Sequence, residues 1–191
     1  MKIRESGMPD EEMWATFFNP EVILDKMGLT SACRTVIEFG CGYGTFTIPA
    51  AKRISGSVYA FDVESEMVKA TRTKVETAGL TNVHVILRDF VYNGTGTPSA
   101  NADYVMLFNI LHTDDPIGLL RETFRVLVPG GKVGIIHWNY DPNTPRGPSM
   151  EIRPRSEQCR AWAEQAGFQL LSPGIIDLPP YHYGLVLKKP I

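Results

Sequence analysis

The chain lacks the features that mark a membrane-spanning protein or a disulfide-stabilised one. No apolar run approaches the ~18 residues that a bilayer-spanning helix needs. The first twelve residues, MKIRESGMPDEE, have no apolar core of the kind found in a signal peptide. Three cysteines occur, Cys33, Cys41 and Cys159, far apart and without a C-x-x-C pair. Their odd number and spacing predict free thiols and a cytoplasmic location.

The chain also has no large excess of charge of either sign. The 19 basic and 21 acidic residues give a net charge of -2, which disfavours a nucleic-acid partner. The four histidines form no closely spaced pair of metal ligands, so we expect no metal site. We expect one domain over residues 1–191, with a helical cap segment at 1–30 and a core at 35–191. The composition does not indicate an oligomeric state.

What the chain does contain is a regular alternation of strand-like and helix-like segments. We expect strands at 36–39, 57–62, 83–89, 103–109 and 133–138, with helices at 45–54, 65–78 and 116–127 and a loop-like crossover at 91–101. Five strands at this spacing predict a doubly wound, mostly parallel α/β sheet. Before the first strand, residues 9–27 predict two helical pieces broken at Asn19-Pro20. After the last, Ser156 is predicted to cap a helix, followed by an antiparallel hairpin of 168–171 and 183–187.

The most informative stretch is VIEFGCGYG, residues 36–44. Glycines at 40, 42 and 44 allow a sharp turn after the strand and let a ligand approach the backbone. The spacing departs from the dinucleotide fingerprint G-x-G-x-x-G because position 45 is Thr. Glu38, two residues before the first glycine, would repel a pyrophosphate and suits a positively charged ligand instead.

Four motifs together resemble the class I S-adenosylmethionine (SAM)-dependent methyltransferases, in the branch of quinone biosynthesis. These are E-F-G-C-G-Y-G at 38–44, the acidic Asp62 that ends the second strand, R-D-F at 88–90, and L-R-E-T-F-R-V-L-V-P-G-G-K-V at 120–133. The similarity covers nearly the whole chain from about residue 20. It implies a Rossmann-like sheet of seven strands with an antiparallel last strand. It also implies methyl transfer from SAM to a small-molecule acceptor by in-line displacement.

Polar side chains end each of the first four expected strands: Glu38, Asp62, Asp89 and Asn109. Each alone is more often a turn or capping residue, but as a set at one sheet edge they favour a ligand site. The resemblance places Glu38 and the glycine turn at the methionine end of SAM. Asp62 can accept from both ribose hydroxyls, and Asp89 from the adenine amine. The expected cofactor-binding residues are Glu38, Gly40, Cys41, Gly42, Gly44, Asp62, Val63, Asp89, Phe90 and Asn109, with Val63 and Phe90 on the faces of the base.

The acceptor half carries weaker signals. A general base is needed only if the acceptor has a proton to lose, and three residues near the expected strand ends are candidates: His112, His137 and Tyr140. For the acceptor we name Trp14, as part of a lid, and Arg146 and Arg153, which can grip an anionic group from a proline-rich loop. The alternatives are a turn histidine, a core histidine and a solvated basic loop.

Two other functions remain open at this point. One is a nicotinamide-dependent oxidoreductase, which the glycine spacing and Glu38 disfavour. The other is a SAM-binding regulator that keeps the fold without turnover.

Overall fold

A computed structural model describes residues 8–191 of the chain. The expectations for residues 1–7, as part of the cap segment and as a start without a signal peptide, lie outside the described residues. None of the described helices is long and apolar enough to span a membrane.

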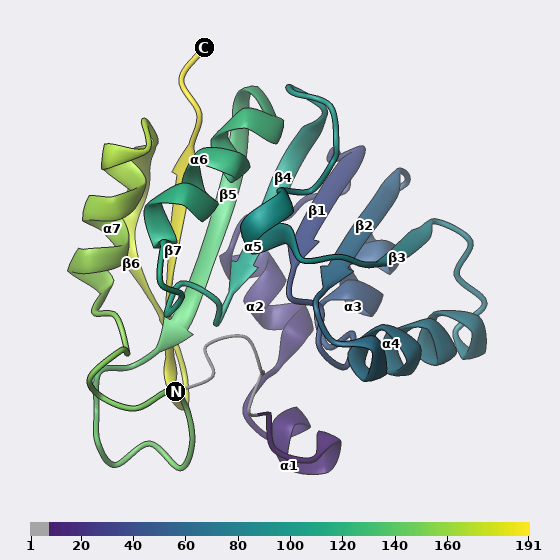
Figure 1. The fold of residues 1–191 in the computed structure, drawn as a ribbon, viewed down its shortest axis with the longest axis horizontal. Coiled ribbons are helices and arrows are strands. Elements are labelled where there is room, and N and C mark those ends of the chain that lie inside the picture. The colour runs from purple at the N-terminus through teal and green to yellow at the C-terminus, as the bar shows by residue number, and fades with distance from the viewer. Residues whose placement is uncertain (1–7) are drawn as a thin grey trace.

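The core is one sheet of seven strands in the order β3-β2-β1-β4-β5-β7-β6 (Figure 1). The strands are β1 (Thr35–Phe39), β2 (Ser57–Asp62), β3 (Val83–Leu87), β4 (Ala102–Phe108), β5 (Leu127–Trp138), β6 (Gln169–Leu178) and β7 (His182–Lys188). The first five pair in parallel, and β7 runs antiparallel to both β5 and β6. The expected α/β class, the doubly wound sheet and the antiparallel last strand are confirmed.

Helices cover both faces of this sheet. They are α1 (Glu11–Ala15), α2 (Pro20–Lys26), α3 (Thr47–Arg53), α4 (Ser65–Thr77), α5 (Phe90–Asn93), α6 (Pro116–Val126) and α7 (Ser156–Gln165). Residues of α5, α6 and α7 pack in the core on one face, whereas α2, α3 and α4 contribute to clusters on the other (Figure 1). With both faces covered, the central strand β4 is an almost unbroken apolar run, as parallel strands require.

The N-terminal segment is tied to the same core. The side chains of Phe17, Phe18 and Leu24 are buried and pack with residues of β1 and β4. The predicted break at Asn19-Pro20 is confirmed, because Asn19 caps α2 and Pro20 is its first residue. The division into a cap segment and a core stays a prediction.

Three local expectations were wrong. The N-cap of α7 is Arg155 rather than Ser156, and the Arg155 backbone N–H donates to Oε1 of Gln158 at 2.8 Å. The crossover expected as a loop begins with the short helix α5. The strand β5 begins at Leu127 and continues through the Pro-Gly-Gly segment, where the Gly130 N–H donates to the carbonyl of Lys189. In each case a partner distant in sequence or an alternative side-chain contact outweighs the local residue preference.

Candidate functional site

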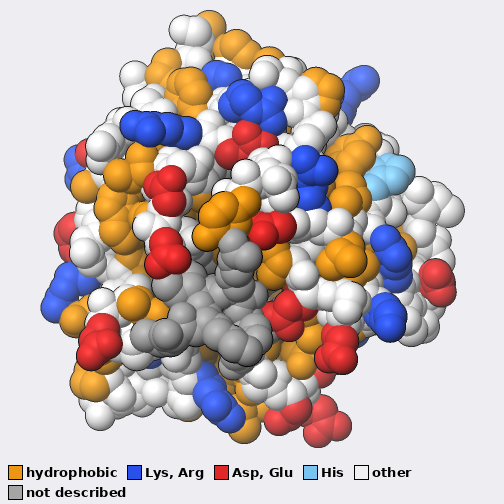
Figure 2. All heavy atoms as spheres, in the orientation of Figure 1, with side chains coloured by type: hydrophobic (Ala, Val, Ile, Leu, Met, Phe, Trp, Pro, Cys, Tyr) orange, Lys and Arg blue, Asp and Glu red, His pale blue; other side chains and the backbone are white. Residues whose placement is uncertain are grey.

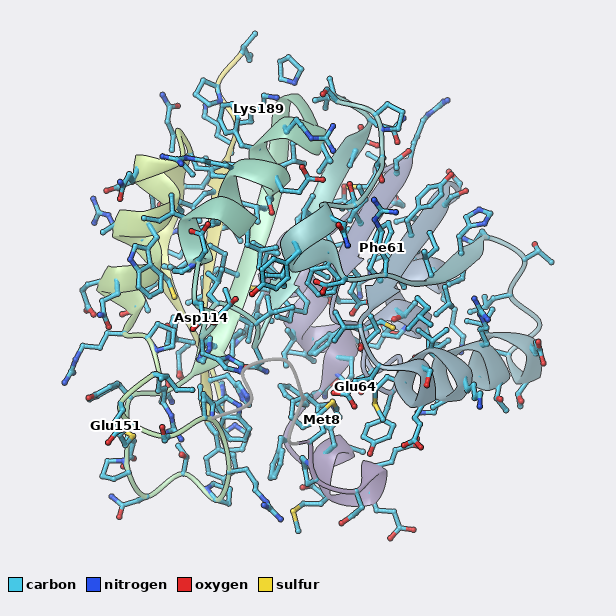
Figure 3. All side chains as sticks on the ribbon, viewed as in Figure 1. Met8, Phe61, Glu64, Asp114, Glu151 and Lys189 are labelled. Carbon is cyan, nitrogen blue, oxygen red and sulfur yellow. The ribbon has the colours of Figure 1, made fainter. Side chains whose placement is uncertain are left out.

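The carboxyl ends of β1, β2 and β4 open into a cavity of about 600 Å³. Nine of the ten residues expected to bind the cofactor line it: Glu38, Gly40, Cys41, Gly42, Asp62, Val63, Asp89, Phe90 and Asn109. Gly44 is not among the lining residues. Met8, Glu64 and Asp114, which also line the cavity, lie around this edge of the sheet in Figure 3.

The turn after β1 lines the cavity, but its N–H groups are not free for a ligand. Gly40 and Gly42 have φ of +75° and +52°, which side chains rarely adopt. A Cβ on Gly40 would lie 2.9 Å from Cδ1 of Ile110. The N–H groups of Gly40 and Cys41 both donate to the Phe61 carbonyl, and that of Gly42 donates to Asp62. Our expectation that the ligand approaches these N–H groups therefore needs correcting, because they are already used within the protein.

Asp62 joins the glycine turn to the end of β2. One carboxylate oxygen accepts from the Gly42 N–H at 2.9 Å, and the other accepts from the Glu64 N–H at 3.0 Å. Each oxygen keeps a second acceptor position for a ligand. Burial raises the pKa of Asp62, although these two backbone hydrogen bonds oppose the shift.

Glu38 is the most deeply placed acid of the cavity. Its side chain is buried and accepts a hydrogen bond of 2.5 Å from Oγ1 of Thr47. Burial raises the pKa of Glu38 to about 8, against the opposing effect of Thr47 and with a further increase from the nearby charge of Asp62. A cation arriving at this wall would stabilise the ionised carboxylate.

Asn109 has a strained backbone and an unsatisfied side chain. It follows β4 with φ of +58° and lines the cavity. Both polar atoms of its amide are buried without a hydrogen-bond partner among the described residues. Buried polar groups are nearly always hydrogen-bonded, so this amide indicates a ligand that completes it.

The third polar strand end has a structural role as well. Asp89 lies two residues beyond β3 and caps α5, where its Oδ1 accepts from the Tyr92 N–H at 3.2 Å. Phe90 is buried and packs edge-on against Phe39, with ring centroids 5.2 Å apart. Both residues still line the cavity, so capping and ligand contact are compatible.

The cavity is strongly acidic. Its carboxylates are Glu38, Asp62, Glu64, Asp89, Asp114 and Asp115, whereas Arg146 is the single Lys or Arg among the described lining residues. Several acidic side chains are also exposed on the face of the molecule drawn in Figure 2. Such a lining favours a cationic ligand and opposes a pyrophosphate.

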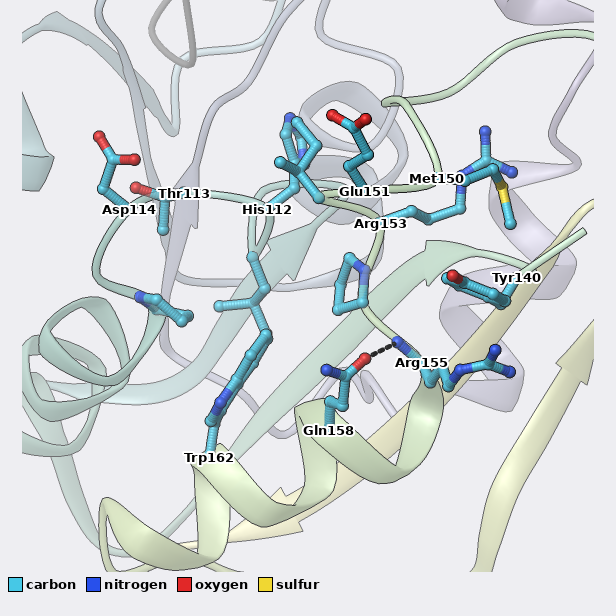
Figure 4. A pocket seen from close by; sticks show the side chains of 14 residues that line it. His112, Thr113, Asp114, Tyr140, Met150, Glu151, Arg153, Arg155, Gln158 and Trp162 are labelled. Carbon is cyan, nitrogen blue, oxygen red and sulfur yellow. Dashed lines mark hydrogen bonds between the residues drawn. The ribbon is translucent and has the colours of Figure 1, made fainter. Parts of the chain in front are cut away.

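A second cavity of about 440 Å³ adjoins the first beside the proline-rich loop (Figure 4). Four residues line both: His112, Thr113, Asp114 and Ile152. Of the residues expected in the acceptor half, Trp14 and Arg146 line the first cavity and Tyr140 and Arg153 the second. In the second cavity, the Arg155 guanidinium lies 3.6 Å from the ring centroid of Tyr140.

Two of the expected catalytic residues form a pair. His112 Nδ1 lies 3.2 Å from Nε2 of His137, although 25 residues separate them in sequence. His137 is completely buried and lines neither cavity, whereas His112 lines both. Burial lowers the pKa of His112 to about 4 and holds that of His137 well below its usual value. His137 therefore reaches the cavities only through His112.

Arg153 holds the proline-rich loop together. Its buried guanidinium donates to the carbonyls of Asn139, Asp141, Arg146 and Pro148 and to the hydroxyl of Thr144. Because these hydrogen bonds use the donors of the guanidinium, they favour a role for Arg153 in organising the loop over a role in binding the acceptor. Arg146, in contrast, is exposed.

Sequence reasoning missed the second cavity almost entirely. Its lining includes Leu111, Met150 and Trp162. Trp162, on α7, packs against the core and also lines this cavity, and helical spacing in a sequence cannot distinguish the two positions. Among the described residues, no group of three or more potential ligands is arranged to hold a metal ion; the absence of a metal site stays a prediction.

The strand order, the glycine turn and the acidic strand ends define a class I methyltransferase fold. Residues 36–131 match the family model described as a methyltransferase domain. The chain belongs to this family, whose cofactor is SAM.

Several known proteins are similar. The chain is 34% identical over 113 residues to a demethylmenaquinone methyltransferase of Listeria welshimeri, covering 58% of this chain and 47% of that protein. It is 28% identical over 101 residues to the aklanonic acid methyltransferase DauC of a Streptomyces species, covering 51% and 45%. The chain thus spans about half the length of the curated relatives it matches. A SAM-dependent methyltransferase structure from Aquifex aeolicus is 27% identical with a TM-score of 0.82, covering 94% of this chain and 93% of that one.

The residues present fit SAM. An acidic cavity suits its two positive charges, Gly40 and Gly42 line that cavity without side chains, and the buried amide of Asn109 has no hydrogen-bond partner among the described residues.

Proposed function

We propose that the protein transfers the methyl group of SAM to a small organic acceptor that binds between the two cavities. The observation that carries this proposal is the acidic cavity at the carboxyl ends of β1, β2 and β4, beside the glycine turn. Both curated relatives described above are named for small organic molecules, which supports the acceptor class.

Each polar group has a proposed task in holding the cofactor. Glu38 receives the ammonium group, and Asp62 accepts from the ribose hydroxyls with the acceptor positions that its two backbone hydrogen bonds leave. Asp89 receives the adenine amine while Val63 and Phe90 cover the base. The Asn109 amide bonds to the methionine end.

When bound, SAM supplies a methyl group on a sulfonium that leaves as a neutral thioether. The task of the protein is therefore to align the acceptor and to exclude water. His112 lies on the shared wall of both cavities, which supports a role for it beside the acceptor. Trp14 closes the first cavity and is held by a hydrogen bond of 3.1 Å from its Nε1 to Oγ1 of Thr45. Tyr140, with Arg155 over its ring, closes the second.

The chemistry of the cavity argues against the oxidoreductase alternative. A dinucleotide needs free N–H groups and positive charge around its pyrophosphate, but the glycine-turn N–H groups donate elsewhere and carboxylates dominate the lining. We further propose a cytoplasmic location, on the basis of the three free thiols.

The test is a transfer assay with SAM labelled in its methyl group and a fractionated extract of low-molecular-mass metabolites. We expect label in a small-molecule fraction with wild-type protein and none with Asp62→Ala. Glu76→Gln, on an exposed position of α4, is the control that keeps activity. Tight binding of SAM without any transfer to small molecules, proteins or RNA would favour the SAM-binding regulator instead.

A further inference from the structure

The contacts of the two histidines between the cavities and the core indicate which of their ring nitrogens carry protons. The Trp138 backbone N–H donates to Nδ1 of His137 at 3.0 Å, so this nitrogen carries no proton. A neutral imidazole holds one proton, which for His137 must then be on Nε2. His137 Nε2 therefore donates to Nδ1 of His112 across the 3.2 Å contact.

The same reasoning extends to the next ring. Because Nδ1 of His112 accepts, its single proton must be on Nε2. The one hydrogen bond that His112 makes with the described residues is through Nδ1, and the residue lines both cavities. Figure 4 shows it in the wall of the second cavity. The chain of donors thus runs from the Trp138 backbone through His137 and His112 into the space where the acceptor binds.

We propose that His112 acts as a hydrogen-bond donor to the acceptor, with His137 as its positioning residue, and that the acceptor presents an oxygen that is already ionised. The proposal rests on the methyl transfer proposed above and identifies its substrate class as enolate or phenolate acceptors. His112 is then no general base, contrary to our expectation from the sequence. A base would need a bare Nε2, which would bring an N–H on Nδ1 against the N–H of His137.

An ionised acceptor needs no base. Its electron pair forms the bond to the methyl carbon, and the electron pair of the broken carbon–sulfur bond stays on sulfur. The negative charge of the acceptor and the positive charge of the sulfonium are both removed, so no proton has to move. The Nε2–H of His112 holds the acceptor oxygen in place for this displacement.

Burial, with a smaller effect of neighbouring basic groups, keeps the pair neutral. Burial is the main cause of the lowered pKa of His137, and the nearby His112, His182 and Arg153 lower it further. The carboxylates of Asp114 and Glu151 line the second cavity together with His112 and oppose this effect. The lowered pKa of His112, about 4, indicates that burial prevails.

The first test needs no ligand. In long-range ¹H–¹⁵N spectra of protein labelled at histidine, we expect both His112 and His137 as Nε2–H tautomers that stay neutral from pH 7.5 to 5.5. In His137→Phe, the donor to Nδ1 is lost, so we expect a mixed tautomer at His112 and an upward shift of its titration midpoint. A His112 with Nδ1–H in the wild type, or one that titrates near its ordinary value, would overturn the proposal whether or not SAM binds.

The second test addresses the substrate class with a pair of probes. Protein saturated with S-adenosylhomocysteine is titrated with 4-nitrophenolate at pH 8 and with 4-nitrotoluene, which has no oxygen on the ring. A hydrogen bond to an ionised group contributes about 1.5–3 kcal/mol, so His112→Leu should weaken phenolate binding by about 10-fold or more and leave the toluene unchanged.

Two variants make this result specific. His112→Gln keeps an N–H donor at the place of Nε2 and should bind phenolate within a few-fold of the wild type. His84→Gln, on the exposed side of β3, should have no effect. If phenolate does not bind, or if the Leu and Gln variants at position 112 behave alike, the donor role is wrong. Failure of S-adenosylhomocysteine to bind would instead contradict the proposed function.

Discussion

Single residues at the cavity wall show how burial prepares a site for a cation. Glu38 is buried beside Asp62, and the cost of two neighbouring charges in a poorly solvated place keeps Glu38 largely protonated near neutral pH. A bound ammonium removes that cost, because it favours the ionised carboxylate. Cofactor binding should therefore release a proton from Glu38.

This coupling predicts a pH dependence of SAM affinity. The pKa of Glu38 in the free protein is about 8. The affinity for SAM should therefore rise by about 20-fold between pH 6.0 and 7.5, because the ionised fraction of Glu38 rises by that factor. Glu38→Gln should bind more weakly at pH 7.5 and lose this dependence. Calorimetric titration of both proteins measures it, and the comparison cancels the titration of the ligand itself. Identical pH profiles for the two proteins would show that Glu38 does not meet the ammonium.

His182 predicts a second pH effect, this time on stability. Both ring nitrogens are buried without hydrogen-bond partners among the described residues, and the ring packs between Phe18 and Trp138. Burial, with a contribution from Arg153, lowers its pKa to about 3. In the unfolded chain His182 takes up a proton at its ordinary pKa of about 6.5, whereas in the folded protein it stays neutral. The free energy of unfolding therefore falls as the pH drops below about 6.5.

Between the folded and the unfolded pKa of His182, the free energy of unfolding falls by about 1.4 kcal/mol per pH unit, which amounts to about 2 kcal/mol at pH 5. In urea unfolding at pH 7 and pH 5, His182→Leu should lose about 2 kcal/mol less than the wild type on acidification. His112 and His137 still titrate in the variant, so a smaller loss remains. An equal loss in His182→Leu and wild type, with His84→Leu as the exposed control, would rule this account out.

At the scale of elements, the loop between β5 and α7 depends on one arginine. The guanidinium of Arg153 joins four carbonyls of this proline-rich loop. Such a hub cannot be read from sequence, because carbonyl acceptors are present at every residue. Only the folded path of the loop decides which arginine they surround.

Arg153→Ala should therefore loosen this loop. Removing a buried network of charged hydrogen bonds typically costs about 2–4 kcal/mol. We expect faster protease cleavage within residues 139–153 and a lower unfolding midpoint. Arg146→Ala removes an exposed side chain of the same loop and should leave both unchanged. Unaltered protease resistance in Arg153→Ala would mean that the loop is held by other contacts.

The strands and the cavity edge could be predicted because a parallel sheet puts residues such as Glu38, Asp62 and Asn109 at one rim whatever the details of the loops. The pairing of His112 with His137 could not, since it depends on the register of β4 against β5. The second cavity could not either, because it is built from a loop and one face of α7.

On the scale of the whole molecule, the fold separates two tasks. The half around β1, β2 and β3 carries the glycine turn and the acids that suit the cofactor, and the half around β5, β7 and α7 carries the loop and the second cavity. The histidine pair lies where these halves meet, between the end of β5 and the segment after β4. Differences in the second half can thus change the acceptor while the first half keeps the same cofactor.

A calorimetric titration of the wild-type protein with SAM and, separately, with NAD tests directly which cofactor the cavity binds. The acidic cavity and the used N–H groups of the glycine turn predict saturable binding of SAM at one site per chain and no measurable heat with NAD. Absence of SAM binding at millimolar concentration, or tighter binding of NAD, would contradict the account.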